Sequence, residues 1–263
     1  MIALYLDAVG LFAPGMPDWN TARDVLAGRT GYAWQDTPPA APPILAPAER
    51  RRAIPLARLT LSTAYEALQA APHKAGAQLA CVFASSDGDS QTVIQIMDGL
   101  SEAEPEVSPI RFANSVHNAT AGYWSIATAM KLGANCISAF DESFAAGLLE
   151  AAAQVGDEGV DVLYTASDAR FLEPLAELRP IGVDCAVSLL LAHAQSPHSI
   201  ARLEIELTPH VPATPLPTYL PVSFASCPAA RALPLAAAAA TASEARLAFD
   251  YLGRTLSVKV TPC

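Results

Sequence analysis

Short apolar runs alternate with segments of helical periodicity along the first 168 residues. The runs predict buried strands, because strands covered on both faces are apolar at successive positions. They lie at residues 3–14, 78–86, 135–140 and 161–168. The intervening segments predict helices at residues 19–28, 56–71, 90–100, 118–132 and 143–155. This alternation is typical of βαβ units and indicates a largely parallel sheet.

Local signals mark the beginnings of helices and one further pair of strands. Residues that favour a helix start precede or open three of the predicted helices: Asp18, Ser90 and Asn118. Apolar runs at 184–194 and 201–209 predict two strands that could pair through a short hairpin. Ser196-Pro197-His198 would lie near its turn.

Two proline-rich segments interrupt the regular pattern. Residues 37–47 contain five prolines and predict an extended surface loop. Residues 209–221 form a second connector of this kind. After it, residues 229–249 predict an alanine-rich helix that Pro234 starts or interrupts, and residues 254–260 predict a terminal strand.

Composition narrows the class of protein. Hydrophobic residues make up 52% of the chain and charged residues 16%, which favours a compact interior. The net charge of −10 argues against a nucleic-acid partner. No run of 18 apolar residues and no basic leader is visible, so we expect a cytoplasmic protein without a membrane span. The five cysteines lack CxxC spacing, as expected for thiols in a reducing compartment.

Motifs for cofactors and metals are missing. The stretch "SSDGDS" at 85–90 lacks the lysine of a phosphate-binding loop and the pattern of a calcium loop, and predicts a polar turn. No G-x-G-x-x-G fingerprint follows the first strand, and no G-x-S-x-G elbow is present. The histidines show no metal-ligand spacing. We therefore expect no cofactor and no metal.

The segment "CISAFDESFAAGL" at 136–148 predicts a strand that turns sharply into a helix. Asp141 or Ser143 could cap this helix, and Glu142 would lie favourably at its positive end. Alternatively, Glu142 or Ser143 could act as a base or nucleophile with a partner that the sequence does not identify. A third possibility is a catalytic elbow that has lost its nucleophile.

Several segments together resemble β-ketoacyl synthases of the thiolase superfamily. The most specific is "VSPIRFANSVHNATAGYWSIATAMKLGANCIS" at 107–138, in which the Ser-Pro, Asn118, the Ala-Gly pair and Gly133 fall where that family places them. Residues 9–32 are similar to the family's opening strand, turn and helix, which end in L-x-x-G-x-[ST]-G. Further similar segments lie at 59–68, 81–93 and 160–169, so that the resemblance covers roughly residues 1–195.

This resemblance implies an α/β, thiolase-like fold, mainly the family's N-terminal half, with a mixed sheet flanked by helices. It implies a ketosynthase-type domain over residues 1–209 and a Pro/Ala-rich extension over 210–263 that packs on it. The residues after the resemblance, about 70, are too few for the family's second half, because one βαβ unit takes roughly 30 residues.

When these segments are matched to those of the family, Glu142 lies where the synthases carry their nucleophilic cysteine. Cys136 lies six residues earlier, within a strand. A carboxylate at a helix N-terminus is stabilised as an anion and is a poor nucleophile, whereas thioester formation requires a good thiolate. The resemblance therefore implies no catalytic residue and no condensation of the usual kind.

Short relatives without the nucleophile resemble chain-length factors of type II polyketide assembly. The truncated form is most similar to the chain-length-factor-like subunit of aryl polyene clusters. The resemblance implies a non-catalytic partner in a heterodimer with a β-ketoacyl synthase, which elongates a chain on acyl carrier protein. Because carrier proteins are acidic like this chain, we expect the carrier to contact the partner. Such partners often carry Gln at the position of Glu142.

The same resemblance places the strand at 135–140 at the dimer two-fold and residues 111–132 along an acyl tunnel. The candidate tunnel and interface residues are Phe112, Val116, His117, Asn118, Thr120, Tyr123, Trp124, Asn135, Ile137 and Phe140. Their bulk would limit chain growth by steric contact. Two alternatives stay open: a stand-alone thioester hydrolase or decarboxylase that uses Glu142 with Ser143 or His117, and a purely structural subunit of the synthase complex.

Overall fold

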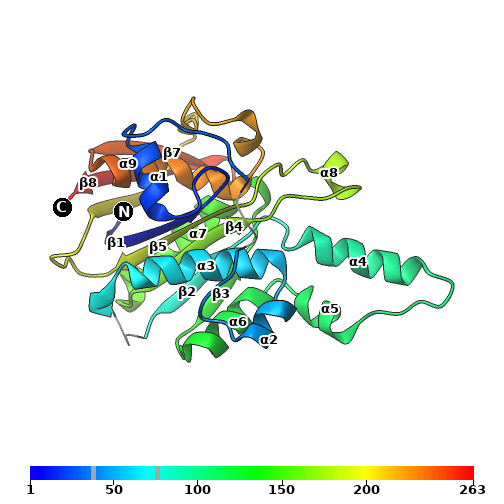
Figure 1. Cartoon of the computed structure of the whole chain (residues 1–263). Helices are drawn as coiled ribbons and strands as arrows, with labels where there is room; N and C mark the ends of the chain where they lie inside the picture. The colour runs from blue at the N-terminus through cyan, green and yellow to red at the C-terminus, as the bar shows by residue number, and fades with distance from the viewer. Residues whose placement is uncertain (37–39, 75–77) are drawn as a thin grey trace.

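The computed structural model describes residues 1–36, 40–74 and 78–263. These residues form an eight-stranded sheet in the order β3-β2-β4-β5-β1-β6-β8-β7, flanked by helices (Figure 1). The strands are β1 (Ile2–Phe12), β2 (Ala80–Ala84), β3 (Ala134–Ile137), β4 (Val162–Asp168), β5 (Cys185–Ala192), β6 (Ala201–Thr208), β7 (Ala245–Tyr251) and β8 (Arg254–Pro262). The predicted mixed sheet flanked by helices is confirmed.

Helices cover both faces of this sheet. The α-helices are α1 (Trp19–Leu26), α2 (Pro47–Arg52), α3 (Pro55–Gln69), α4 (Ser90–Ser101), α5 (Pro109–Asn114), α6 (Ala119–Thr128), α7 (Ser143–Ala153), α8 (Leu175–Leu178) and α9 (Leu233–Thr241). The shorter helical turns are η1 (Pro72–Lys74), η2 (Phe140–Glu142), η3 (Gln154–Glu158), η4 (Val222–Phe224) and η5 (Pro228–Ala232). Figure 1 shows α3 lying along the sheet and α1 packed beside α9.

Most neighbouring strands run antiparallel, so the expectation of a largely parallel sheet is wrong. In the described part of the chain, only β2 pairs in parallel, with β3 on one side and β4 on the other. The remaining neighbours are antiparallel. Helical crossovers join β2 to β3 and β3 to β4, and the βαβ pattern predicts parallel pairing correctly only there.

The hairpin predicted between residues 184 and 209 is also wrong, because β1 lies between β5 and β6. Leu6 of β1 lies opposite Leu191 on one side and Ala201 on the other. The connection over residues 193–200, which contains Ser196-Pro197-His198, passes across the intervening strand. The outer two strands of such a trio are only about 10 Å apart, so a short connection is long enough.

Two hydrophobic cores lie on opposite faces of the sheet. Val82 of β2 belongs to the core beneath α1, α7 and α9, whereas the next residue, Phe83, belongs to the core beneath α3 and α6. This alternation follows from the two-residue period of side chains along a strand. All five residues of β2 are buried, because helices cover both of its faces.

Three predicted boundaries need correction. Asp89, not Ser90, caps α4, because its carboxylate accepts hydrogen bonds from the backbone N and the Oγ1 of Thr92. The side chain of Asn118 makes no capping hydrogen bond, and α6 ends at Thr128, not at residue 132. The strand predicted to reach residue 140 ends at Ile137, because the chain turns into η2. By contrast, Asp18 caps α1 as predicted, accepting from Thr21 N at 2.8 Å.

The proline-rich segment at 37–47 agrees with its prediction only in part. Residues 37–39 lie outside the described residues, and residues 40–46 form no helix or strand. Leu45 is buried in the core, however, and Pro47 is the first residue of α2. A purely exposed loop is therefore the wrong description, because Pro42 and Leu45 of this segment are both buried.

The C-terminal part of the chain joins the same sheet. The alanine-rich helix covers only Leu233–Thr241, with Pro234 in its first turn, and the helix predicted to reach residue 249 is wrong beyond that point. Leu247 and Phe249 alternate with more exposed residues and form β7 instead. β8 pairs with β6 along its length. A domain boundary at residue 209 stays a prediction.

Candidate functional site

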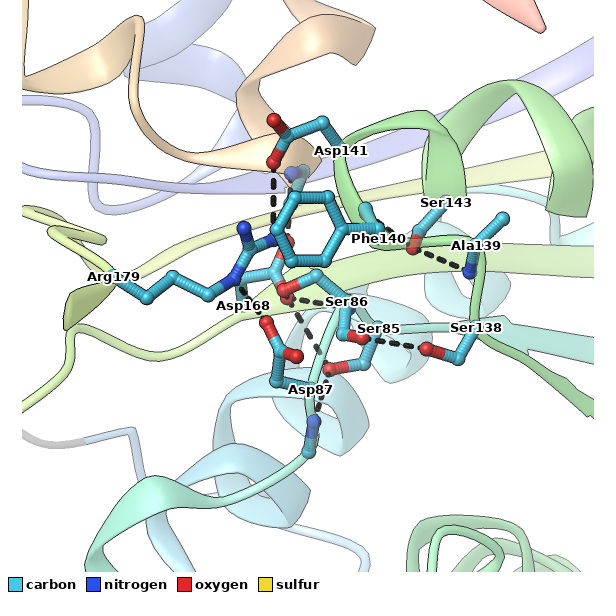
Figure 2. A network of polar contacts seen from close by, with 12 residues as sticks. Ser85, Ser86, Asp87, Ser138, Ala139, Phe140, Asp141, Ser143, Asp168 and Arg179 are labelled. Carbon is cyan, nitrogen blue, oxygen red and sulfur yellow. Dashed lines mark hydrogen bonds and ion pairs between the residues drawn. The ribbon is translucent and has the colours of Figure 1, made fainter. Parts of the chain in front are cut away.

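The elbow between β3 and α7 is held in an unusual backbone conformation. The backbone of Phe140 has a φ of +53°, a value that residues other than glycine rarely adopt. Ala139 N donates a hydrogen bond to Ser143 Oγ at 3.0 Å, and this hydroxyl donates to Phe140 O at 2.7 Å. The prediction that Asp141 or Ser143 caps α7 is wrong, because no side chain of the described residues makes a capping hydrogen bond to this helix and Ser143 bonds within the preceding turn instead. Figure 2 shows these contacts at the turn.

Glu142 turns toward the C-terminal hairpin. Its Oε2 accepts a hydrogen bond of 2.6 Å from the backbone N of Leu252, in the turn between β7 and β8. Leu252 and Gly253 have φ values of +47° and +71°, as a tight two-residue hairpin turn requires. Glu142 also borders a cavity of about 240 Å³, together with Arg231 and Asp250. The carboxylate thus contributes to tertiary packing.

The three residues of the hydrolase alternative do not come together. Ser143 is 2% exposed and uses its hydroxyl within the elbow. His117 lies on the α5–α6 connection, where its Nε2 is 3.5 Å from Ser85 O. Among the described residues, no hydrogen bond joins Ser143 to His117 or to Glu142. A nucleophile needs a base within hydrogen-bonding reach, so this geometry does not support that alternative.

A buried carboxylate lies beside the elbow. Asp168 is the last residue of β4 and is 2% exposed. Its Oδ1 accepts from Ser86 N and Ser86 Oγ, both at 2.8 Å, and from Ser85 Oγ at 3.2 Å. Its Oδ2 accepts from Ala229 N at 2.8 Å. Burial outweighs these hydrogen bonds and raises the pKa of Asp168 from 3.8 to about 6.

Arg179 closes the elbow from the segment between β4 and β5. Its Nη2 lies 3.0 Å from Asp141 Oδ1, and its Nε donates to Asp87 Oδ2. The guanidinium lies 3.6 Å from the centre of the Phe140 ring, a cation–π distance. Figure 2 shows Arg179 stacked against Phe140 and placed between the two aspartates. The turns after β2 and β3 are thereby tied to the segment after β4.

Exposed apolar side chains are concentrated in one stretch of the chain, which includes the edge strand β3. Of the 17 strongly exposed large hydrophobic side chains of the described residues, nine fall between residues 93 and 140. They are Val93, Met97, Leu100, Ile110, Phe112, Val116, Ile126, Leu132 and Phe140, and we name them the edge surface. β3 is the outermost strand there, and Figure 1 shows α4 reaching away from the body of the molecule with α5 beside it.

The candidate tunnel and interface residues separate into an exposed and a buried group. The exposed members are Phe112, Val116, His117, Asn118, Asn135 and Phe140, and the half-buried ones are Tyr123 and Ile137. Thr120 is 7% exposed and Trp124 only 1%. Trp124 packs edge to face on Phe83 within the core beneath α3. Val116, His117 and Thr120 do border a cavity, but of only about 80 Å³.

Thiols and metal-binding groups offer no further centre. Burial raises the pKa of Cys81 to about 12 and also raises that of Cys136, which disfavours a reactive thiolate. Within residues 1–36, 40–74 and 78–263, no group of three or more His, Cys, Asp or Glu side chains is arranged to hold a metal ion. None of the helices described combines the length and apolar character that a membrane crossing requires.

Sequence reasoning missed Asp168, Ser85, Ser86 and Arg179. A signal for the first three was present, because "SSDG" follows one strand and "SD" ends another. β2 and β4 are parallel neighbours, so their carboxyl ends meet at one edge of the sheet. Arg179 carried no such signal, since it lies in an irregular segment whose path only the fold determines.

Comparisons with known proteins agree with this architecture. The family described as "Beta-ketoacyl synthase, N-terminal domain" matches residues 24–243. A search of curated protein sequences gave no significant match. The chain is similar to one from the ketosynthase (ApeO) in complex with its chain length factor (ApeC) from Xenorhabdus doucetiae, with 20% identity and a TM-score of 0.74, over 98% of this chain and 100% of the other.

Two further solved structures show the same fold. One is AntDE:AntF, a type II polyketide synthase acyl-carrier protein in complex with its ketosynthase, at 11% identity and a TM-score of 0.76, covering 100% of this chain and 99% of the other. The other is the ishigamide ketosynthase/chain length factor, at 13% identity and a TM-score of 0.73, covering 99% of each chain. At these identities the likeness establishes the fold.

Proposed function

The chain belongs to the β-ketoacyl synthase N-terminal domain family, and from this premise we propose that it is a non-catalytic, chain-length-factor-like partner of a β-ketoacyl synthase. In this role it pairs with the synthase and shapes the acyl tunnel in which a polyene or polyketide chain grows on acyl carrier protein. The similar structures support this proposal, since two of them contain a ketosynthase together with a chain length factor.

The edge surface is the observation that carries the proposal. Large exposed apolar side chains cost free energy in water and mark interaction sites when they cluster. Here they lie in the stretch of chain that contains β3, a strand that pairs with β2 alone in the described sheet, and α6, which carries Ile126, packs against β3. A free strand edge offers unpaired backbone groups to a second chain. Apolar side chains and an open edge together fit a lasting interface with another subunit.

The geometry at the elbow favours a non-catalytic role. Glu142 accepts from the β7–β8 turn, and the hydroxyl of Ser143 donates to Phe140 O within the elbow. Arg179 covers Phe140 and is held by two aspartates. The stand-alone hydrolase or decarboxylase would require Glu142, Ser143 or His117 to act on a thioester, and no cooperation between them is present in the described contacts.

The pairing is tested by co-expression with a candidate synthase and measurement of the mass of the purified complex. We expect a heterodimer that Ile126→Asp disrupts, because Ile126 is 73% exposed within the edge surface. Val222→Asp is the matched control, since Val222 is 87% exposed and lies on η4, outside the edge surface. A stable monomer in the presence of the synthase, or equal effects of both variants, would contradict the proposed interface.

The tunnel is tested separately by the products of the reconstituted pair. Phe112→Gly and Val116→Gly remove exposed bulk from the edge surface and should lengthen the product if either residue forms the end wall. Tyr219→Gly, which removes an exposed aromatic ring elsewhere, should not. Intact pairing with an unchanged product distribution in all variants would favour the purely structural subunit.

A further inference from the structure

A second cavity lies away from the elbow, where three segments meet. It has a volume of about 330 Å³ and lies between the start of α3, the start of α4 and the segment that joins β4 to β5. Apolar walls come from Phe12, Leu59 and Leu172. A volume above about 300 Å³ is within the range of small-molecule sites. The cavity is therefore large enough for a ligand.

Some of the charged side chains that line this cavity form ion pairs and others do not. Arg170 Nε lies 3.5 Å from Asp184 Oδ2, so these two lining residues neutralise each other. Asp89 also lines the cavity, but its carboxylate accepts from Leu56 N at 3.3 Å and from Thr92 N at 2.9 Å. No ion pair within 4.0 Å joins the Asp89 carboxylate to the guanidinium of Arg58, which also lines the cavity.

Among the charged residues that line the cavity, Arg58 has no partner in the described part of the chain. Its Nε is buried and makes no hydrogen bond, and no carboxylate of the described residues lies within 4.0 Å of its guanidinium. A partly buried charge without a counterion is costly, and proteins usually pair it. The chain has 26 acidic and 16 basic residues, so counterions are not scarce. An unpaired arginine at a cavity wall is thus most simply explained by a ligand.

We propose that this cavity binds a small molecule with a carboxylate or phosphate head and an apolar chain. Arg58 would receive the head, because a guanidinium donates two parallel hydrogen bonds to either group. Phe12, Leu59 and Leu172 would enclose the chain. The site uses neither the edge surface nor the elbow residues, so the proposal is independent of pairing with a synthase and of the tunnel.

Calorimetric titration of the full chain tests this site with octanoate, octyl phosphate, inorganic phosphate and octanol. We expect octanoate or octyl phosphate to bind, and whichever head binds more tightly identifies the head that the site accepts. Octanol should bind at least about tenfold more weakly, because it lacks the charged hydrogen bonds. Inorganic phosphate should also bind more weakly, since it leaves the apolar walls unused.

Two variants assign the binding to this cavity. Arg58→Gln should weaken octanoate binding about tenfold or more. Leu172→Asp, at a residue 44% exposed, should also weaken it, because it places a carboxylate in the apolar wall beside the ligand's hydrocarbon chain. Arg29→Gln is the control, because Arg29 is an exposed arginine paired with Asp24 outside the cavity. Thermal unfolding of each variant verifies that it is folded. No binding by the parent chain, or equal binding by Arg58→Gln, would overturn the proposal.

Discussion

The raised pKa of Asp168 predicts a pH dependence of folding stability that one substitution can isolate. Its carboxyl titrates at about 6 in the folded chain because of burial, against 3.8 ordinarily. The folded state therefore holds the proton more tightly than the unfolded state between these values. The stabilisation from protonation is fully present below pH 4 and is lost as the pH rises through about 6.

The size of this effect follows from the two pKa values. Each pKa unit corresponds to about 1.4 kcal/mol, so the difference between 3.8 and about 6 corresponds to about 3 kcal/mol. Other carboxyl groups titrate in the same range, and their contributions must be removed. Asp168→Asn cannot titrate and otherwise keeps the shape of the side chain. The difference between parent and variant therefore reports Asp168 alone.

Urea unfolding of both proteins from pH 4 to pH 7.5 measures this difference. We expect the parent to lose about 2 kcal/mol of unfolding free energy relative to Asp168→Asn between pH 4 and pH 6.5, and little above that. The variant has its own constant penalty, because its amide would meet the N–H of Ala229 that now donates to Oδ2. The unfolding free energy of the parent minus that of the variant should fall with pH. A difference that stays constant or rises with pH would refute burial as the dominant influence on the pKa of Asp168.

Three further substitutions test contacts around the elbow. Glu142→Ala should lower the unfolding free energy by about 1 kcal/mol through the lost bond to Leu252 N, and Glu142→Gln should restore most of it; equal losses would exclude that bond as the cause. Gly147→Ala should lower the unfolding free energy, measured with urea, by about 1–3 kcal/mol, since a Cβ there would lie 2.6 Å from the Tyr164 ring. An unchanged unfolding free energy would show that the ring can move. Arg179→Gln should speed amide hydrogen exchange at residues 139–142 several-fold by removing two ion pairs and a ring stack, whereas unchanged exchange would mean that the elbow holds itself.

The sequence predicts the elements of the fold better than their order in the sheet. Asp18 and the apolar run at 80–84 give correct local structure, because capping and burial are local properties. The position of β1 between β5 and β6 is not local, since residues about 190 apart in sequence pair there. The same applies to residues 245–249, where a strand partner overrides alanine-rich helix propensity.

The candidate site shows the same limit at the level of side chains. The elbow was visible as a strand followed by a helix start, and the structure has this turn at residues 138–143. Whether Glu142 faces a substrate or a neighbouring turn depends on where Leu252 lies, which no local pattern contains. Trp124 was predicted to line a tunnel or interface, but it is buried in the core. Its position on an apolar helix is compatible with either place, so the sequence could not distinguish them.

The packing of α7 connects the elbow to the C-terminal part of the chain. Phe144, in the first turn of α7, is 1% exposed. Its ring lies 5.0 Å from that of Phe249 on β7 and 5.9 Å from that of Tyr164 on β4. β7 belongs to the C-terminal part, which covers the side of α7 that the sheet leaves open. Phe144 and Phe249 also line the cavity of about 240 Å³ beside Glu142, so the contacts that bury the start of α7 also shape the space next to the elbow.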